Sequence, residues 1–527
     1  MVSTESLESR DGQIDLKVVV LIWFSLLLYS LIAAPIPAVN EPHYLCKARH
    51  YWQPEWCAGD FFLESANAHT VFFATVGALT QWCTLWQTAL IGRLIALLVL
   101  ALGWSNMLVT IQPGRWVPLL ACWLFLALQA CGNFSGEWLV GGVEGKVFGY
   151  GFLFAAIGQL NRRRVISAGA LAGLAISFHP VIGIWGLLAL IGTLFLEWLP
   201  FGIRRCVPGT TRADSASVAG DAPNTASGIT VGGWAIGIGL LIICSLPGLL
   251  PAFRLLSEAV PDPIKGAANF IQVHYRLAHH LDPRAFLMRA YLGYAGLMIV
   301  WIVLAWTGQP SAAACRFNRL AGCAVLFAVM GILIGWSPYE QRAQLLKFYP
   351  FRLADLLVPV AVSIGIVRRD PSARWRRVAF ACYAGLFVFA LVRAHQVAEV
   401  NRIPAEQQAD WIGACDWIDE HLPKDVLVFA PHNGWAFKWF ARRAEYVAYK
   451  DCPQDAAGIV EWNRRLLFLQ KWFAAHYDDE FYSAEELRDF RKRTGITHIL
   501  TDRIGPLELD PVFQNGTYDI YDLTTLD

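Results

Sequence analysis

The sequence predicts an all-α polytopic membrane protein with about eleven transmembrane helices and a small α/β domain at its C-terminus. Three observations support this fold class. Of the 527 residues, 56% are hydrophobic and only 16% are charged, whereas a soluble protein carries roughly 25% charge. Apolar stretches that could cross a bilayer, at about 20 residues each, recur between Val18 and Val392. After these stretches the charge density becomes that of a water-soluble domain.

The predicted spans follow one another through the first three quarters of the chain. They are residues 17–36, 88–111, 116–131, 147–160, 165–178, 181–199, 232–250, 286–306, 320–336, 353–367 and 378–392. Many of the 22 Trp residues lie near the ends of these spans, as in the aromatic belts of membrane surfaces. The first span follows a segment that is acidic as well as basic, so we expect a retained helix rather than a cleaved signal peptide.

Arginine clusters decide the orientation. One side of the predicted spans collects Arg115, Arg162–Arg164, Arg204–Arg205, Arg316, Arg319, Arg368–Arg369, Arg374 and Arg376–Arg377. The positive-inside rule makes that side cytoplasmic. Residues 69–86 are also apolar enough to cross, but a crossing there would move residues 162–164 outside. We therefore expect an interfacial or re-entrant helix at residues 69–86.

The chain accordingly divides into three parts. Residues 1–16 form a cytoplasmic N-terminus, residues 17–397 the multi-pass membrane domain, and residues 398–527 an extracytoplasmic α/β domain. The membrane domain includes an external loop at residues 37–87. It also includes a cytoplasmic loop at residues 203–230, whose Ser, Ala, Gly, Thr and Asp content predicts flexibility.

Periodicity predicts both helices and strands in the C-terminal domain. Residues 426–430, 445–449, 498–502 and 518–521 are expected strands. Residues 435–442, 458–473 and 484–493 are expected helices, and Gly495 stands where a C-terminal cap belongs. No glycine-rich phosphate motif follows the first strand, so the sequence gives no sign of a nucleotide site. The near-neutral balance of 43 Lys+Arg against 42 Asp+Glu gives no sign of a nucleic-acid partner.

Two pairs of cysteines lie in the parts that we expect outside the cell. Cys46 and Cys57 share the first external loop, and Cys415 and Cys452 share the C-terminal domain. An extracytoplasmic compartment permits disulfides. Spacing alone does not establish the distance between two cysteines, so each pair stays open as a disulfide or as two thiols. No CxxC pair occurs, which leaves a zinc knuckle or a thioredoxin-like site unsupported.

Candidate acids lie in the first external loop. Glu41 follows the first span directly, and a carboxylate there could take a proton from an acceptor hydroxyl as a general base. Asp60 is a second carboxylate in the same loop. The alternative is a solvated loop whose acids pair with Lys47 and Arg49.

Candidate binding residues lie at the external ends of later spans. Lys146 opens a span, where exposed backbone N–H groups would help it hold a phosphate; a salt bridge with Glu144 or an interfacial anchor is the alternative. His179 ends the short span 165–178 before Pro180, which leaves room for a polar pocket or indicates a tilted span.

Further candidates follow the seventh span and open the tenth. Arg276, His279 and His280 could bind an anionic head group or be ordinary interfacial residues. Adjacent histidines point in different directions and make a poor pair of ligands for one metal. Arg352 could face a lipid-linked phosphate, for which its planar fork is suited, or pair with Asp355 one turn later.

With these residues in view, the chain resembles the GT-C superfamily of membrane glycosyltransferases, which have many spans, an acidic first external loop and often a C-terminal extracytoplasmic domain. It is most similar to an uncharacterised family of bacterial multi-pass membrane proteins. The motifs that carry this likeness are residues 40–45, 178–183, 276–283, 347–355 and 461–465.

The resemblance implies a glycosyltransferase of the bacterial inner membrane that moves a sugar from a polyprenyl-phosphate donor to an unknown acceptor on the extracytoplasmic side. Glu41 would match the catalytic acid, with Asp60 supporting it, although Asn40 replaces the second acid that many members carry. The substrate-binding set would be Lys146, His179, Arg276, His279, His280 and Arg352. Membrane lipid is an expected partner. No cofactor is assigned, and a divalent metal stays open. A transporter or flippase of a lipid-linked or polar solute and a non-catalytic membrane scaffold are the alternatives.

Overall fold

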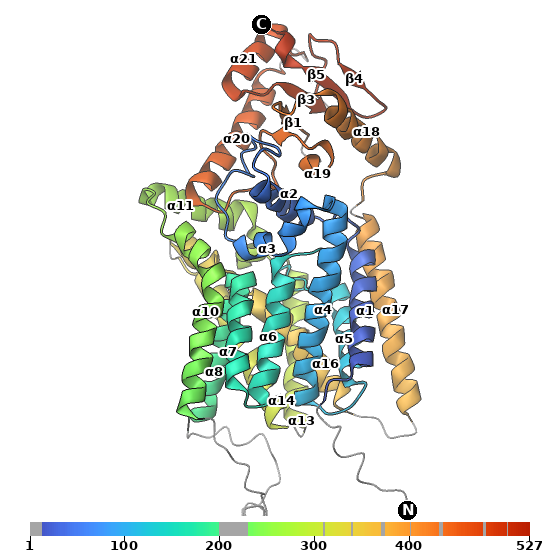
Figure 1. Ribbon diagram of the computed structural model, residues 1–527, viewed down its shortest axis with the longest axis vertical. Helices are drawn as coiled ribbons and strands as arrows, with labels where there is room; N and C mark the ends of the chain where they lie inside the picture. The colour runs from blue at the N-terminus through green and yellow to red at the C-terminus, as the bar shows by residue number, and fades with distance from the viewer. Residues whose placement is uncertain are drawn as a thin grey trace, which may run out of the picture.

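A computed structural model describes residues 13–199, 230–308, 311–338, 341–369, 375–400, 402–431, 436–477, 481–502 and 504–526. Long helices stand side by side in a bundle, and a small domain with a β-sheet sits on one end of it (Figure 1). We call this end of the bundle the domain end. The predicted loop at residues 203–230 lies outside the described residues except for its last residue.

Eleven helices of the described chain form the bundle. They are α1 (Leu16–Ala33), α4 (Leu85–Ile111), α5 (Val117–Cys131), α6 (Gly145–Asn161), α7 (Val165–Phe178), α8 (Pro180–Trp198), α10 (Val231–Leu256), α13 (Met288–Thr307), α14 (Ala312–Trp336), α16 (Arg352–Val367) and α17 (Arg376–Val400). Seven of them, α1, α4, α8, α10, α13, α14 and α17, are long and apolar enough to cross a membrane. The remaining four are shorter.

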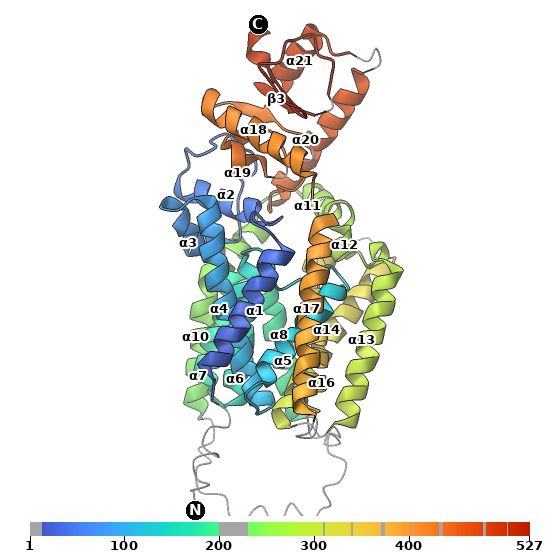
Figure 2. The ribbon, with the colours of Figure 1, turned by 90° about the vertical axis from the view of Figure 1, so that its right-hand side faces the viewer.

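The surface of the bundle is apolar. Helix α13 stands at its edge (Figure 2) and buries none of its residues, and Leu292, Ile299 and Trp306 on it are 67%, 62% and 80% exposed. Water would make such a surface costly, whereas lipid chains cover it without penalty. The structure thus confirms the predicted fold class of a multi-pass helical membrane protein with a small C-terminal α/β domain.

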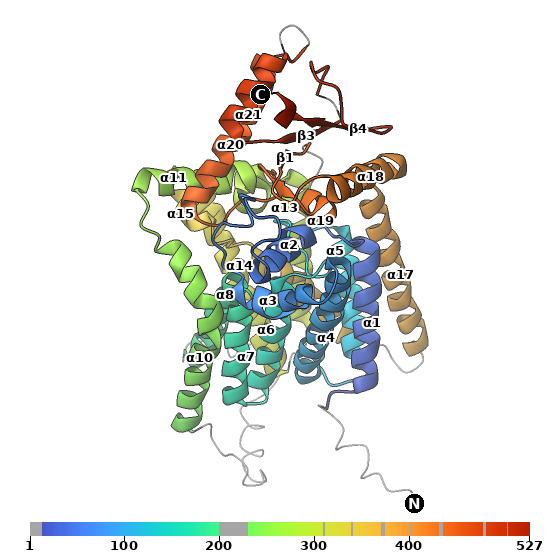
Figure 3. The same ribbon diagram turned by 45° about the horizontal axis from the view of Figure 1, so that its top comes forward.

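Small residues let the helices of the bundle approach closely. A Cβ added at Gly103 of α4 would collide with the backbone of Gly151 on α6, and one added at Gly169 of α7 would collide with Gly237 on α10. Membrane helices pack in this way because lipid supplies no hydrophobic drive between them. Helix α10 also contains Pro247 and Pro251, and its upper part leans outward from the bundle (Figure 3).

Short helices cover the domain end of the bundle. The first loop forms α2 (Glu41–Trp52), α3 (Thr70–Ala74) and the 3₁₀ helix η3 (Val76–Gln81). Residues 69–86 therefore hold only a five-residue and a six-residue helix before α4, both too short to cross a bilayer. The same end carries α11 (Asp262–Phe270; Figure 1), the π-helix η4 (Ile271–Arg276), α12 (Ala278–Leu281; Figure 2), η5 (Pro283–Ala285) and α15 (Arg342–Leu346; Figure 3).

The C-terminal domain begins with α18 (Ala405–His421) and is built on a five-stranded sheet. Its strands are β1 (Leu427–Phe429), β2 (Ala444–Glu445), β3 (His498–Thr501), β4 (Phe513–Gln514) and β5 (Asp519–Asp522), in the order β2-β1-β3-β5-β4. Strand β1 is parallel to β2 and β3, whereas β5 is antiparallel to β3 and β4. The other helices are α19 (Phe437–Ala441), α20 (Ala456–Ala475), α21 (Ala484–Thr494) and η6 (Leu523–Thr525).

Local sequence signals explain much of this domain. Ser483 and Glu486 form a capping box that starts α21, and Gly495 ends it with a φ of 75°, in the left-handed region that favours glycine. The expected strand at residues 445–449 is shorter than predicted, because β2 ends at Glu445. The residues after Glu445 instead turn toward the membrane domain and contact it, as described below.

The two candidate cysteine pairs are free thiols in the structure. Cys415 packs in a hydrophobic cluster with Trp411 and Tyr518, whereas Cys452 belongs to another cluster with Trp462. Cys46 and Cys57 are both buried in the core of the membrane domain. Each of the four behaves as a small apolar side chain.

Candidate functional site

A cavity of about 1510 Å³ lies where the domain end of the bundle meets the C-terminal domain. Its walls come from distant parts of the sequence: the start of α2, the loop before α6, the beginning of α8, the ends of α10 and α14, η4, the segment before α16, and residues 450–459. Helices from the membrane domain and a segment of the C-terminal domain therefore enclose one space.

One side of the cavity is an apolar groove between three helices. Helices α8, α10 and α14 line this groove. The lining side chains are Val181, Ile184, Leu188, Leu249, Phe253, Leu256, Phe327, Met330 and Ile334. Leu188, Phe253 and Met330 remain 43%, 56% and 50% exposed. In a membrane these exposed faces meet lipid, so the groove is open to the bilayer from the side.

The other side of the cavity is polar and carries more cations than acids. Six cationic side chains line it, namely Lys146, Lys265, Arg276, Lys347, Arg352 and Lys450. Four acids line it, namely Glu137, Glu144, Glu258 and Asp262. The two sets leave a formal charge of +2 when the histidines are neutral (six minus four). Such a surface favours the binding of an anion at the polar side of the cavity.

Arg352 and Glu137 form a buried ion pair on the cavity wall. The Arg352 Nε lies 2.8 Å from the Glu137 Oε2, and the guanidinium stacks on the Tyr349 ring at 4.0 Å. The alternative pair with Asp355 does not form. Asp355 instead accepts hydrogen bonds from the backbone N–H groups of Phe134, Ser135 and Glu137. The first turn of α16 thus holds the loop before α6 in place.

Lys146 lines the cavity and forms the ion pair with Glu144 that was the alternative to a phosphate-binding role. Its ammonium lies 3.6 Å from the centre of the Trp138 ring and 3.5 Å from the Glu144 carboxylate. Asn40, the residue before α2, donates to the other oxygen of Glu144 at 2.8 Å. Lys146 is therefore a cavity residue at the start of α6 that also has a local acidic partner.

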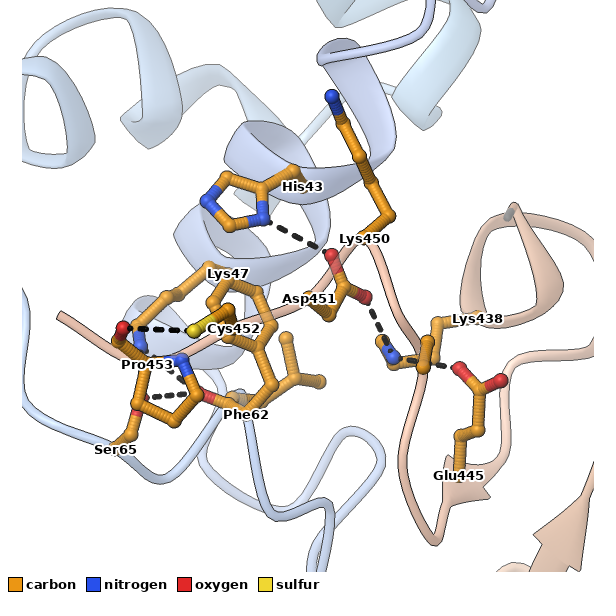
Figure 4. Close-up of polar contacts among 12 residues, drawn as sticks. His43, Lys47, Phe62, Ser65, Lys438, Glu445, Lys450, Asp451, Cys452 and Pro453 are labelled. Carbon is orange, nitrogen blue, oxygen red and sulfur yellow. Dashed lines mark hydrogen bonds and ion pairs between the residues drawn. The ribbon is translucent and has the colours of Figure 1, made fainter. Parts of the chain in front are cut away.

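Arg276 and Lys450 are cavity cations with no acidic partner among the described residues. Arg276 ends η4 and donates to the Lys450 carbonyl at 3.2 Å. Figure 4 shows the Lys450 side chain pointing away from Asp451. Within the described part of the chain, neither cation meets a carboxylate at ion-pair distance. Burial lowers the pKa of Lys450, against the effect of Glu144. An anion bound there would offset this burial.

Two of the three predicted histidines line the cavity. His179 caps α8, where its Nδ1 accepts from the Ile182 N–H at 3.3 Å. His280 donates from Nδ1 to the Ser135 carbonyl at 2.6 Å and so braces the same loop as Asp355. His279 is exposed, and its ring lies 4.1 Å from that of His280 at an angle of 43°. Among the residues that the structure describes, no three His, Cys, Asp or Glu side chains gather as a metal site.

Glu41 lies away from the cavity wall, in a buried ion pair with Arg93 of α4. The Arg93 Nε and Nη2 donate to its two carboxylate oxygens at 2.7 and 2.8 Å. The backbone N–H groups of Ala38 and Val143 donate to the same oxygens at 2.8 and 2.9 Å. Because both oxygens are occupied and the side chain is fully buried, the geometry suits Glu41 to hold α2 on α4 rather than to accept a proton.

Asp60 lies in the contact between the first loop and the C-terminal domain. One of its oxygens accepts from the backbone N–H groups of Phe62 and Leu63, and the other accepts from the Glu445 N–H at 3.0 Å. Neither Lys47 nor Arg49 is its partner. Lys47 donates to the Phe62 carbonyl and to Ser65 instead (Figure 4).

A buried charge cluster surrounds Lys438 at this contact. Its ammonium lies 2.7 Å from Asp451, 2.8 Å from Glu445 and 3.4 Å from Asp60. His43 of α2 lies 3.0 Å from the other oxygen of Asp451 (Figure 4). Burial would raise the pKa of Asp451, but Lys438 and His43 outweigh burial and lower it. Burial raises the pKa of Glu445 to about 7. This cluster fixes the segment that carries Lys450 against the membrane domain.

Comparison with known proteins adds a domain match and one weak structural likeness. Residues 409–468 match a family described as a domain of unknown function, DUF6798. This segment contains Lys438, Glu445, Lys450 and Asp451. A search of curated proteins finds no match. The crystal structure of ArnT from Cupriavidus metallidurans bound to undecaprenyl phosphate is similar at 12% identity, over 96% of this chain and 97% of that chain, with a TM-score of 0.38. A likeness at this level decides nothing about the cavity.

The sequence patterns missed two cavity residues that matter most for its chemistry. Glu137 follows Ser135 and Gly136 at the end of a predicted span, and its charge beside a membrane was the available signal. Lys450 sits in the C-terminal domain, and no local pattern indicates that it reaches the membrane domain.

Proposed function

We propose that this protein is a membrane glycosyltransferase of the GT-C type that takes a sugar from a polyprenyl-phosphate donor. One observation carries the proposal: a single cavity joins an apolar groove that is open to the bilayer with a cationic end that is closed by the C-terminal domain. The isoprenoid chain would lie between α8, α10 and α14. Its phosphate would meet Arg276, Lys450, Lys146 and Arg352, and the sugar would fill the polar end.

The cationic end suits the chemistry of transfer. When the bond between the sugar and the phosphate breaks, negative charge grows on the departing phosphate oxygen. Cations already in place stabilise that charge without reorganisation. Arg276 and Lys450 are the natural ligands of this oxygen, because they have no carboxylate to neutralise them. Arg352 and Lys146 share their charge with Glu137 and Glu144.

The arginine pattern supports transfer on the extracytoplasmic side of a bacterial inner membrane. Arg115, Arg162, Arg316 and Arg368 lie at the ends of α4, α6, α14 and α16 that point away from the C-terminal domain (Figure 1). The positive-inside rule makes this the cytoplasmic end. The cavity and the C-terminal domain would then face outward.

Lipid binding by the purified protein tests the proposal. Undecaprenyl phosphate is titrated against the wild type and against the double variant Arg276→Gln/Lys450→Gln. This variant strands no buried acid, because neither cation has an acidic partner. We expect at least about tenfold weaker binding, since each charge-assisted contact contributes about 1.5–3 kcal/mol. Lys424→Gln/Lys471→Gln, at two exposed sites of the C-terminal domain, is the control. Equal affinity in all three proteins would contradict the proposed phosphate site.

Transfer is tested with a panel of radiolabelled polyprenyl-phosphate sugars in membranes that contain the protein. Release of label from the lipid by the wild type, above the level in control membranes, supports a transferase. Binding of the lipid without release of any sugar would contradict the transferase and favour a transporter or flippase.

A further inference from the structure

We propose that Glu137 is the proton acceptor of the transfer reaction, an inference that rests on the proposed function. Glu137 belongs to the loop between α5 and α6 and lines the cavity. It is a different residue, in a different loop, from the first-loop acid Glu41. Three structural features carry the inference: one free carboxylate oxygen, a rigid support, and a bond to a phosphate-facing arginine.

One oxygen of the Glu137 carboxylate has no partner in the described part of the chain. The side chain is 2% exposed, and its Oε1 is buried without a hydrogen bond, while its Oε2 is held by Arg352. A buried unpaired carboxylate oxygen is costly, because it has lost its water without gaining a donor. A donor supplied by a ligand in the cavity would remove this cost. The hydroxyl group of a sugar acceptor is such a donor.

Two residues outside the loop hold the loop that carries Glu137. Asp355 binds its backbone N–H groups from α16, as described above. His280 of α12 donates to the Ser135 carbonyl. Gly136 has a φ of 77°, and a Cβ at this position would collide with the His280 ring, so only glycine fits between them. A carboxylate held in this way is prepositioned for one geometry of its substrate.

The other candidate acids either have partners for their carboxylate oxygens or have no contact with the cations proposed to bind the phosphate. Glu144 meets Asn40 with one oxygen and Lys146 with the other. Both oxygens of Glu41 are occupied, and Asp60 binds the C-terminal domain. Glu258 also lines the cavity with an unpaired oxygen. It follows the end of α10, however, and pairs with no cation among the described residues, so it has no link to the phosphate ligands.

The proposed step transfers one proton and one sugar. The Glu137 Oε1 takes the proton from the acceptor hydroxyl, and the acceptor oxygen forms a bond to the anomeric carbon. The bond from that carbon to the phosphate oxygen breaks, and its electron pair leaves with the lipid phosphate. Protonation neutralises Glu137, so Arg352 loses its counter-charge as the phosphate gains negative charge. The Glu137–Arg352 pair thereby couples proton removal to stabilisation of the leaving group.

The test compares Glu137→Gln with the wild type on a donor that the wild type accepts. We expect transfer to fall at least about 100-fold, since general bases contribute about 10²–10⁴-fold. Undecaprenyl phosphate should bind at least as tightly as to the wild type, because Arg352, unlike the fully buried Arg93, borders the cavity and is left free to meet the phosphate. Retained lipid binding shows that the variant is folded and that Arg352 is in place.

Glu137→Asp and Glu258→Gln complete the test. The aspartate variant keeps a carboxylate and should recover at least about a tenth of the wild-type rate. If the glutamate served only as a structural spacer of fixed length, the shorter aspartate would not restore transfer. Transfer by Glu137→Gln above a tenth of wild type, or a comparable loss in Glu258→Gln with Glu137→Gln active, would overturn the inference. Failure of the wild type on every donor would instead overturn the proposed function, and the inference with it.

Discussion

Arg93 holds the carboxylate of Glu41 with two hydrogen bonds of 2.7 and 2.8 Å, and both side chains are fully buried. The same guanidinium donates to the Ala34 carbonyl at 2.6 Å, so the pair joins the end of α1, the start of α2 and α4. The resemblance to GT-C enzymes gave Glu41 a catalytic role. The geometry supports a role in holding the first loop on the membrane domain.

Glu41→Gln should therefore destabilise the protein rather than remove only its chemistry. The substitution leaves Arg93 buried with one carboxylate lost, and breaking a buried ion pair costs about 3–5 kcal/mol. We expect a lower yield of monodisperse protein and a lower midpoint of thermal unfolding in detergent. Glu55→Gln, at an exposed glutamate of the same loop, should behave as wild type. A stable Glu41→Gln variant without transfer activity would instead indicate that Glu41 is catalytic.

The sequence predicted the membrane architecture well because hydropathy depends only on local composition. Each of the eleven predicted spans corresponds to a helix of the bundle. The Glu41–Arg93 pair was missed because its members are 52 residues apart. A signal existed in the sequence, since an arginine inside an apolar span requires an acidic partner. The pairing of Arg352 with Glu137, 215 positions away (352 minus 137), had no such signal, and the helical spacing pointed to Asp355 instead.

Local sequence patterns also did not predict the contact between the membrane domain and the C-terminal domain. The segment after Glu445 looked like the continuation of a strand, but β2 pairs over only two residues and the chain then turns to the membrane domain. Lys438, Asp451 and His43 meet there in a cluster that tertiary packing alone creates.

Asp355→Asn should lower the rate of transfer without weakening lipid binding. Asp355 accepts from the N–H groups of Phe134, Ser135 and Glu137, and an amide N–H₂ in place of one oxygen would face donors. The loop would shift and move Glu137 from its position. We expect at least about a tenfold loss of turnover, with undecaprenyl phosphate affinity within about threefold of wild type. Asp416→Asn, at an exposed site on α18, is the control. Wild-type turnover in Asp355→Asn would show that the loop does not need this support.

The apolar groove should select long isoprenoid chains. Leu188→Trp places a bulky ring in the groove between α8, α10 and α14. We expect weaker binding of undecaprenyl phosphate and unchanged binding of a short-chain isoprenyl phosphate, because the cationic end stays intact. Leu292→Trp, on lipid-facing α13 outside the cavity, should affect neither ligand. If Leu188→Trp weakens both ligands equally, the chain does not lie in this groove.

The contact between the domains should weaken as the pH rises toward 8. Burial raises the pKa of Glu445 to about 7, from its usual value of 4.5. A carboxyl group with a raised pKa contributes stability that is full below about pH 4.5 and is lost as the pH rises through about 7. Its charged neighbours are Lys438, Asp451 and Asp60. Limited proteolysis of the C-terminal domain should therefore be faster at pH 8 than at pH 5.5.

Glu445→Gln keeps an oxygen for Lys438 but cannot titrate, so it should flatten this pH dependence. Glu461→Gln is the matched control, because the hydrogen bond from Arg464 lowers the pKa of Glu461 to about 2, outside the range tested. If the Glu445→Gln variant and the wild type respond equally to pH, another group controls the contact.

Photocrosslinking tests the central claim, that this cavity binds a polyprenyl phosphate with its chain in the groove. A polyprenyl phosphate with a diazirine in the chain is bound to the protein, irradiated and mapped by mass spectrometry, with unlabelled undecaprenyl phosphate as competitor. The account predicts competable labels on the halves of α8, α10 and α14 nearest the domain end, around Leu188, Phe253 and Met330. Labels that appear mainly on α13 or α1, or labels that the unlabelled lipid does not displace, would contradict it.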